Sequence, residues 1–165
     1  KEPINSYNKA RSRFFSEYGF QSFPEFESVK RYAPYPEDWD IYSEVMMSHQ
    51  RGGAHANGLI ETYLLNEYRQ PKDFEAFLYM NHVLQGDAIK TAIEAHRRDM
   101  PYCMGTLFWQ HNDCWPVASW SSVELMSPAK NWHDMIFTPS PLPEPPAMPM
   151  IRLFMSQNPP ACRFR

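Results

Sequence analysis

The pattern of apolar and polar positions predicts two short strands, one near each end of residues 1–125. The first runs from Ser12 to Ser16, is partly apolar, and is followed by Glu17 and the turn-prone Gly19. The second, Cys103 to Trp109, is a continuous apolar run, and a strand that is apolar on both faces is typical of a covered parallel sheet. Both predicted strands therefore end beside residues that can carry chemistry.

Helices are predicted between the two strands, after a loop. Proline disfavours helix at and before its own position. The loop prolines are Pro24, Pro34 and Pro36. A helix is then expected from about Trp39 to Gln50, with Asp38 as its N-cap and Gly52-Gly53 at its end. Another is expected from Asn57, as the N-cap, to about Tyr68, before Pro71.

The segment from Lys72 to Met100 has the clearest helical pattern, and Pro101 ends it. Its apolar residues recur at steps of three and four, as they do on one buried helical face. These residues are Phe74, Phe77, Leu78, Leu84, Ala88, Ala92 and Ile93. A strand, then helices, then a strand predicts an α/β fold.

Composition narrows the class of protein. Hydrophobic residues make up 43% of the 165 residues and charged residues 21%, as in globular chains. The formal net charge of −3 provides no basic field, so we expect no nucleic-acid partner. We also expect no membrane partner, because no apolar run approaches the ~20 residues of a span and no signal peptide opens the chain. Three cysteines cannot form a closed disulfide framework.

The last 40 residues differ from the rest. From Met126 onward the chain holds nine of its 16 prolines and none of its six glycines. This change predicts a boundary near Leu125, with a domain over residues 1–125 and a proline-rich, irregular or aberrant tail over 126–165. Within the tail, Thr138 to Pro146 is typical of polyproline II. It is either a ligand for an aromatic groove or the product of a changed reading frame or splice.

Candidate chemistry lies at the ends of the two predicted strands. Active groups of α/β folds are found at the C-terminal ends of strands. Glu17 has the chemistry of a nucleophile or general base, and Trp109 that of an apolar floor for a sugar ring. Strand-end glutamates are also often structural, and tryptophans in apolar runs are often core residues. The residues alone leave these interpretations open.

Two long motifs resemble the β-mannosidases of glycoside hydrolase family 2. The stretch Arg13-Phe-Phe-Ser-Glu-Tyr-Gly-Phe-Gln-Ser-Phe-Pro24 is similar to that family's nucleophile segment. The stretch from Pro101 to Ser122, which includes Trp109-Gln-His-Asn-Asp-Cys-Trp-Pro116, is similar to its last barrel strand and the following loop. Pro71-Lys-Asp-Phe-Glu75 and Leu84-Gln-Gly-Asp-Ala-Ile-Lys90 resemble the helices before that strand. The resemblance covers roughly residues 10 to 125.

This resemblance implies the C-terminal part of a (β/α)8 barrel, with its last two strands and their helices, from a retaining exo-β-mannosidase. It implies that Glu17 is the nucleophile and that Trp109 lines the sugar subsite. The neighbouring residues expected to bind substrate are Tyr18, Asn112 and Asp113. Arg13 is expected to support Glu17, because residues four apart on a strand share a face. The implied partner is a β-mannoside oligosaccharide.

The second carboxyl of a retaining glycosidase has no counterpart in this sequence. In the family it follows an asparagine well upstream of the nucleophile. The dipeptide Asn66-Glu67 follows Glu17 instead, within a predicted helix, so no acid/base role is assigned to it. The chain is therefore expected to need the missing barrel half as a partner. No cofactor or metal is expected, because the cysteines and histidines lack zinc-ligand spacing.

Two alternatives remain open at this point. One is a related exo-β-glycosidase, such as a β-glucosaminidase. The other is a non-catalytic carbohydrate-binding or interaction module with Trp109, Trp115 and Trp120 as its stacking platform. The cellular compartment also stays open, because related enzymes occur in lysosomes and in bacterial envelopes.

Overall fold

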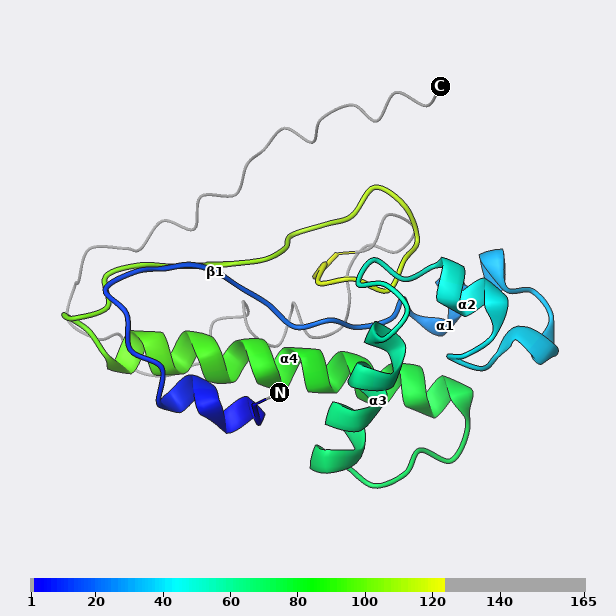
Figure 1. Cartoon of the computed structure of the whole chain (residues 1–165), viewed down its shortest axis with the longest axis horizontal. Coiled ribbons are helices and arrows are strands. Elements are labelled where there is room, and N and C mark those ends of the chain that lie inside the picture. The colour runs from blue at the N-terminus through cyan, green and yellow to red at the C-terminus, as the bar shows by residue number, and fades with distance from the viewer. Residues whose placement is uncertain (1, 124–165) are drawn as a thin grey trace, which may run out of the picture.

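The structure, a computed structural model, describes residues 2–123, which form a mixed α/β fold with two parallel strands (Figure 1). In chain order the elements are η1 (Ile4–Asn8), β1 (Phe15–Tyr18), α1 (Phe26–Tyr32), η2 (Pro36–Asp38), α2 (Glu44–Ser48), α3 (Ala56–Glu67), α4 (Phe74–Arg98) and β2 (Thr106–Phe108). The expected α/β class and the parallel pairing are confirmed. The predicted tail, residues 126–165, lies outside the described residues.

Helix α4 is the longest element and forms the layer beneath the strands (Figure 1). It begins at Asp73, whose carboxylate accepts a hydrogen bond from the Ala76 amide at 2.7 Å. Its last turn carries Arg97 and Arg98, whose positive charges interact favourably with the helix dipole. The apolar periodicity predicted this helix to within two residues at each end, because caps and buried face agree.

The core lies between α4 and the elements that cover it. Helix α3 packs across α4, η1 runs beside it, and β1 and β2 lie along it (Figure 1). Leu64 of α3 and Leu84 and Ala88 of α4 are fully buried in this core. Phe23, from the segment after β1, is also fully buried and lies edge-on to Phe77 of α4. One long amphipathic helix thus organises the layers around it.

The helix expected from Trp39 to Gln50 is much shorter, because Ser43 is its N-cap. The Ser43 hydroxyl accepts a hydrogen bond from the Met46 amide at 3.2 Å, so α2 spans Glu44–Ser48. Upstream, the Asp40 carboxylate accepts from the Tyr42 amide at 2.7 Å and holds a turn. The expected cap, Asp38, is the last residue of η2 instead.

The expected loop between Pro24 and Pro36 contains a helix, α1. Proline is disfavoured in the interior of a helix, but none lies between Pro24 and Pro34, and these residues leave room for a seven-residue helix. Val29 of this helix is fully buried in the core, which stabilises it. Tertiary packing here outweighs the local signal of the prolines.

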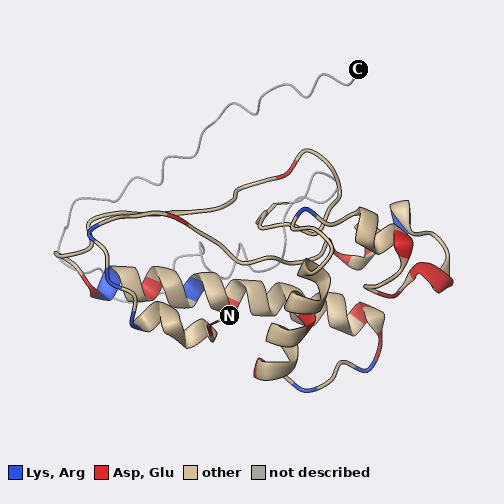
Figure 2. Cartoon of the chain, viewed as in Figure 1, with Lys and Arg blue, Asp and Glu red and all other residues tan. Residues whose placement is uncertain are grey.

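The strands differ in position and length from those predicted. The first was expected over Ser12–Ser16, whereas β1 begins at Phe15 and ends at Tyr18, so Glu17 lies within the strand and not after it. The second is shorter, because only Thr106–Phe108 of the apolar run from Cys103 to Trp109 is strand. Figure 2 shows both signs of charge over the helices, whereas β1 and β2 contain one charged residue, Glu17.

No helix within residues 2–123 is long and apolar enough to cross a membrane.

Candidate active site

Glu17 lies in an irregularity of β1 that directs it away from α4. Phe15 pairs with Thr106 and Tyr18 pairs with Phe108, so β1 advances three residues where β2 advances two. Such a bulge breaks the alternation of side chains. Phe15 and Tyr18 both turn toward α4, where their rings lie 3.6 Å and 4.9 Å from the ring of His96. Ser16 and Glu17, between them, are exposed.

Trp109 follows β2 directly and lies beside the end of β1. Its amide donates a hydrogen bond to the Tyr18 carbonyl at 2.7 Å, and its side chain is 48% exposed. The two strand ends can approach so closely because residue 19 is glycine. A Cβ at Gly19 would lie 2.2 Å from the Trp109 carbonyl oxygen. The structure therefore brings the predicted nucleophile and the predicted sugar platform to adjacent strand ends.

The inner side of the sheet is packed around His96 of α4. The His96 side chain is 2% exposed, and its Nδ1 lies 2.8 Å from the Thr106 hydroxyl. Burial lowers the pKa of His96. Burial also raises the pKa of the Tyr18 hydroxyl. Tyr18, expected to contact substrate, thus faces the helix layer rather than the exposed side where Glu17 lies.

Arg13 does not pair with Glu17 in the structure. Its guanidinium lies over the Tyr102 ring, 5.8 Å from the ring centroid. Among the described residues, no ion pair is formed between Arg13 and Glu17. Arg13 precedes β1, and the bulge between Phe15 and Tyr18 interrupts the alternation on which its expected support of Glu17 was based, so that support stays a prediction.

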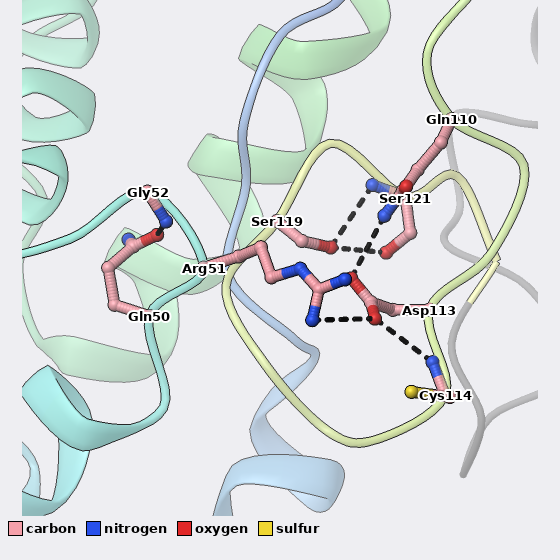
Figure 3. Close-up of polar contacts among 8 residues, drawn as sticks. All are labelled: Gln50, Arg51, Gly52, Gln110, Asp113, Cys114, Ser119 and Ser121. Atoms are coloured by element: carbon pink, nitrogen blue, oxygen red, sulfur yellow. Dashed lines mark hydrogen bonds and ion pairs between the residues drawn. The ribbon is translucent and has the colours of Figure 1, made fainter. Parts of the chain in front are cut away.

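Asn112 and Asp113, the other predicted substrate contacts, differ in their surroundings. Asn112 is exposed and forms an isolated bridge with Val123. Asp113 is buried, at 7% exposure, and its carboxylate is already occupied. It accepts from Gln110 Nε2 at 2.9 Å and from the Cys114 amide at 3.0 Å, and it lies 3.9 Å from Arg51 Nη1 (Figure 3).

A buried polar network joins the segment after β1 and the turn after α2 to helices α3 and α4. Gln50 Oε1 accepts from Gln21 Nε2 at 3.1 Å, and Gln50 Nε2 donates to Asn57 Oδ1. Asn57, expected as a helix cap, is instead fully buried inside α3, where its amide also donates to the Ile41 carbonyl at 2.6 Å. Nearby, the Ser22 hydroxyl donates to Gln85 Oε1 at 2.6 Å. Sequence reasoning missed these residues.

The sequence contains a weak signal for these buried polar residues. Asn57 and Gln85 are amides on otherwise apolar helix faces, and a buried amide needs hydrogen-bond partners. Gln50 and Arg51 directly precede the Gly52-Gly53 pair, which was interpreted only as a helix end. Gly53 has φ of +80°, so the chain turns there, and the turn presents Arg51 to the loop after β2.

A cavity of about 430 Å³ lies near the strand ends but does not contain the predicted site. Its lining includes Tyr7, Phe20, Tyr63 and Trp120, and neither Glu17 nor Trp109 belongs to it. Trp120 thus faces a different space from Trp109. Trp115 packs against His49 at 5.1 Å. Trp109 and Trp120 both lie beside Gly19, whereas Trp115 packs in a different place, against His49. Within residues 2–123 no three potential ligand side chains gather as a metal site.

Comparisons with known proteins relate this chain to a part of β-mannosidases. No protein-family model matches the chain. It is partly homologous to β-mannosidases: it is 34% identical over 133 residues to β-mannosidase B of Thermothelomyces thermophilus and 31% identical over 127 residues to β-mannosidase B of Aspergillus terreus. Each match covers 75% of this chain.

A solved structure agrees with the sequence comparisons. The crystal structure of the β-D-mannosidase from Dictyoglomus thermophilum matches 82% of this chain with a TM-score of 0.76 and 29% sequence identity. The match covers 16% of that chain, and the chain spans 15% of the length of the fungal relatives. The expected resemblance to β-mannosidases is confirmed for this part of their length.

Proposed function

We propose that residues 1–125 are the C-terminal part of the (β/α)8 barrel of a retaining exo-β-mannosidase, with Glu17 as the nucleophile and Trp109 as the floor of the sugar subsite. The observation that carries the proposal is the pairing of the two strand ends. The Trp109 amide donates a hydrogen bond to the carbonyl of Tyr18, the residue after Glu17. Both Glu17 and Trp109 are exposed.

In this proposal the Glu17 carboxylate attacks the anomeric carbon of a terminal β-mannoside. The bond from that carbon to the leaving oxygen breaks, and a second carboxyl group donates the proton that the leaving alkoxide takes up. The two carboxyls of a retaining enzyme are about 5–5.5 Å apart. Water then hydrolyses the mannosyl ester, and the second carboxylate recovers its proton from that water.

The second carboxyl is assigned to the remainder of the barrel. Glu67, of the dipeptide Asn66-Glu67, is the last residue of α3. It lines another cavity, with Tyr68, Asp87 and Glu94, and not the strand ends. This position supports leaving Glu67 out of the catalytic pair. The chain then contributes a nucleophile and half of a sugar subsite.

The exposed side of the sheet supports a need for the missing barrel half. In the described part of the chain the sheet has two strands, so each strand has one edge without a strand partner. Large apolar side chains are exposed on or beside these strands: Phe14, Met104, Leu107 and Trp109. A closed barrel would pair both edges and cover these residues. The proposed partner is therefore the remainder of a β-mannosidase barrel.

Labelling with 2-deoxy-2-fluoro-β-mannosyl fluoride tests the catalytic part of the proposal. The reagent traps the glycosyl-enzyme, and its activated leaving group reduces the need for an acid catalyst. We expect a mannosyl adduct on Glu17, identified by intact mass and peptide mapping. Glu17→Gln should abolish it, and Glu67→Gln should retain it. An adduct on another residue would overturn the assignment, and no adduct, with Glu17 intact, would mean that the chain is a remnant of a mannosidase rather than a working one.

Comparison of sugars tests the specificity. For this comparison, 5-fluoro-β-glycosyl fluorides keep the substituent at C2, and the glucosaminyl reagent should label Glu17 more slowly than the mannosyl reagent. Equal or faster labelling of Glu17 by the glucosaminyl reagent would instead favour a β-glucosaminidase.

A further inference from the structure

We propose that Arg51 and Asp113 are positioning residues, which hold the loop after β2 and thereby the Trp109 platform. The proposal rests on the proposed function, because it takes Trp109 as the sugar-binding residue. It also changes the role of Asp113. The sequence indicates a substrate contact at this position, whereas the geometry points to a carboxylate whose bonds are all directed into the protein.

The Asp113 carboxylate uses both oxygens within its own loop. Oδ2 accepts a hydrogen bond from Gln110 Nε2, and Oδ1 accepts one from the Cys114 amide (Figure 3). The Asp113 side chain is 6% exposed. A buried carboxylate is costly unless a cation and hydrogen-bond donors compensate it. With its oxygens occupied in this way, Asp113 is better suited to hold the loop than to bind a sugar hydroxyl.

Arg51 supplies the cation from a different part of the chain. It lies in the turn between α2 and α3, and its Nη1 is 3.9 Å from Asp113 Oδ1 (Figure 3). The turn is itself fixed. The Arg51 amide donates to the Ala118 carbonyl at 2.9 Å, and the Gly52 amide donates to Gln50 Oε1 at 2.7 Å. The ion pair therefore joins a rigid turn to the middle of the loop after β2.

Gln110 connects this pair to the sugar platform. It is the residue directly after Trp109, its side chain donates to Asp113, and its amide donates to the Trp120 carbonyl at 3.0 Å. The Trp109 amide is bonded on its other side to the Tyr18 carbonyl. Trp109 is thus held between β1 and the Asp113 network. Release of Asp113 would remove one of the hydrogen bonds that fix the chain beside Trp109.

Hydrogen–deuterium exchange of peptides that cover residues 109–118 tests the proposal without any need for activity. Arg51→Gln removes the cation, and we expect exchange there to rise by about threefold or more, because buried hydrogen bonds to a charged group weaken. Arg51→Lys keeps a cation and should restore most of the protection. Arg11→Gln, which breaks the ion pair with Asp99 at the far end of α4, is the matched control and should leave this loop unchanged.

A second variant addresses the carboxylate itself. Asp113→Asn keeps the shape but has one acceptor oxygen, so it cannot accept from both Gln110 Nε2 and the Cys114 amide. Exchange should rise at least as much as in Arg51→Gln. Unchanged exchange in both variants, or no recovery with Arg51→Lys, would overturn the positioning role.

Labelling kinetics of Glu17 connect the loop to sugar binding. In Arg51→Gln, the concentration of mannosyl fluoride for half-maximal labelling should rise about threefold or more, with the maximal rate unchanged, because Trp109 contacts the ring and not the bond that breaks. A lower maximal rate with unchanged half-maximal concentration would contradict the inference. Absence of labelling in the parent protein would instead count against the proposed function, and the exchange experiment would still decide the role of Arg51 and Asp113.

Discussion

The two faces of the β1–β2 sheet are built differently. On the face toward α4, Phe15 stacks on the His96 ring and Tyr18 lies edge-on to it. The Thr106 hydroxyl lies 2.8 Å from His96 Nδ1. On the opposite face, Glu17 is exposed and Leu107 and Trp109 are 39% and 48% exposed. The same two strands thus have one side packed against α4 and one side that is open. The comparison predicts that the inner face contributes more to stability, and the proposed chemistry of Glu17 belongs to the outer face.

Truncation of one residue on each side gives the sharpest test of this comparison. Phe15 of β1 stacks on His96 of α4 at the inner face, so Phe15→Ala should lower the free energy of unfolding by about 3 kcal/mol. Leu107→Ala, on the open face, should change it by less than about 0.5 kcal/mol. Urea unfolding followed by tryptophan fluorescence measures both. Comparable losses would show that the outer face is already packed.

A methyl group at Gly19 should disturb both faces at once. The added Cβ would meet the Trp109 carbonyl at 2.2 Å, and a backbone atom cannot rotate away as a side chain can. We expect Gly19→Ala to cost about 1–3 kcal/mol of stability and to prevent labelling of Glu17. Gly58→Ala, where the nearest atom is the Tyr42 hydroxyl at 3.3 Å, is the matched control. Normal stability and labelling in Gly19→Ala would contradict the close approach of the strand ends.

The smallest effect expected is a pH dependence carried by the inner face. Burial places the pKa of His96 below the ordinary value of 6.5, so the unfolded chain binds this proton more readily than the folded one. The contribution of neutral His96 to stability is therefore complete above pH 6.5 and declines as the pH falls through that value toward the folded-state pKa. His96→Gln should flatten this decline in urea unfolding between pH 8 and 5. The exposed His55→Gln should not, and an unchanged slope in His96→Gln would exclude His96 as its source.

The sequence predicted best those features that depend on local periodicity. The α4 helix was found because its apolar spacing and its Asp73 cap agree, and the α/β order followed from two apolar runs around it. The α2 boundary failed because Ser43 competes with Asp38 as a cap, and only packing decides between them. For α1, the burial of Val29 overrides the loop signal of the flanking prolines.

The candidate site could be predicted only in part. Glu17 and Trp109 were placed at strand ends from motifs, and the structure brings those ends together. The bulge in β1 leaves no mark in the sequence, so the pairing of Arg13 with Glu17 could not be rejected beforehand. Likewise, the contact between Arg51 and Asp113 joins residues 62 positions apart, and no spacing rule connects them.

The parallel pairing of β1 with β2 also determines when during folding the site can form. Tyr18 meets Phe108 across about 90 residues of chain, so this pairing must close a long loop, whereas the intervening helices form from contacts between near neighbours. We therefore expect α3 and α4 to form first and the two strands to meet late, since non-local contacts slow folding. During synthesis, the chain must be extended beyond Phe108 before Glu17 acquires its neighbour Trp109. A chain that ended before β2 would contain the carboxylate but no sugar subsite.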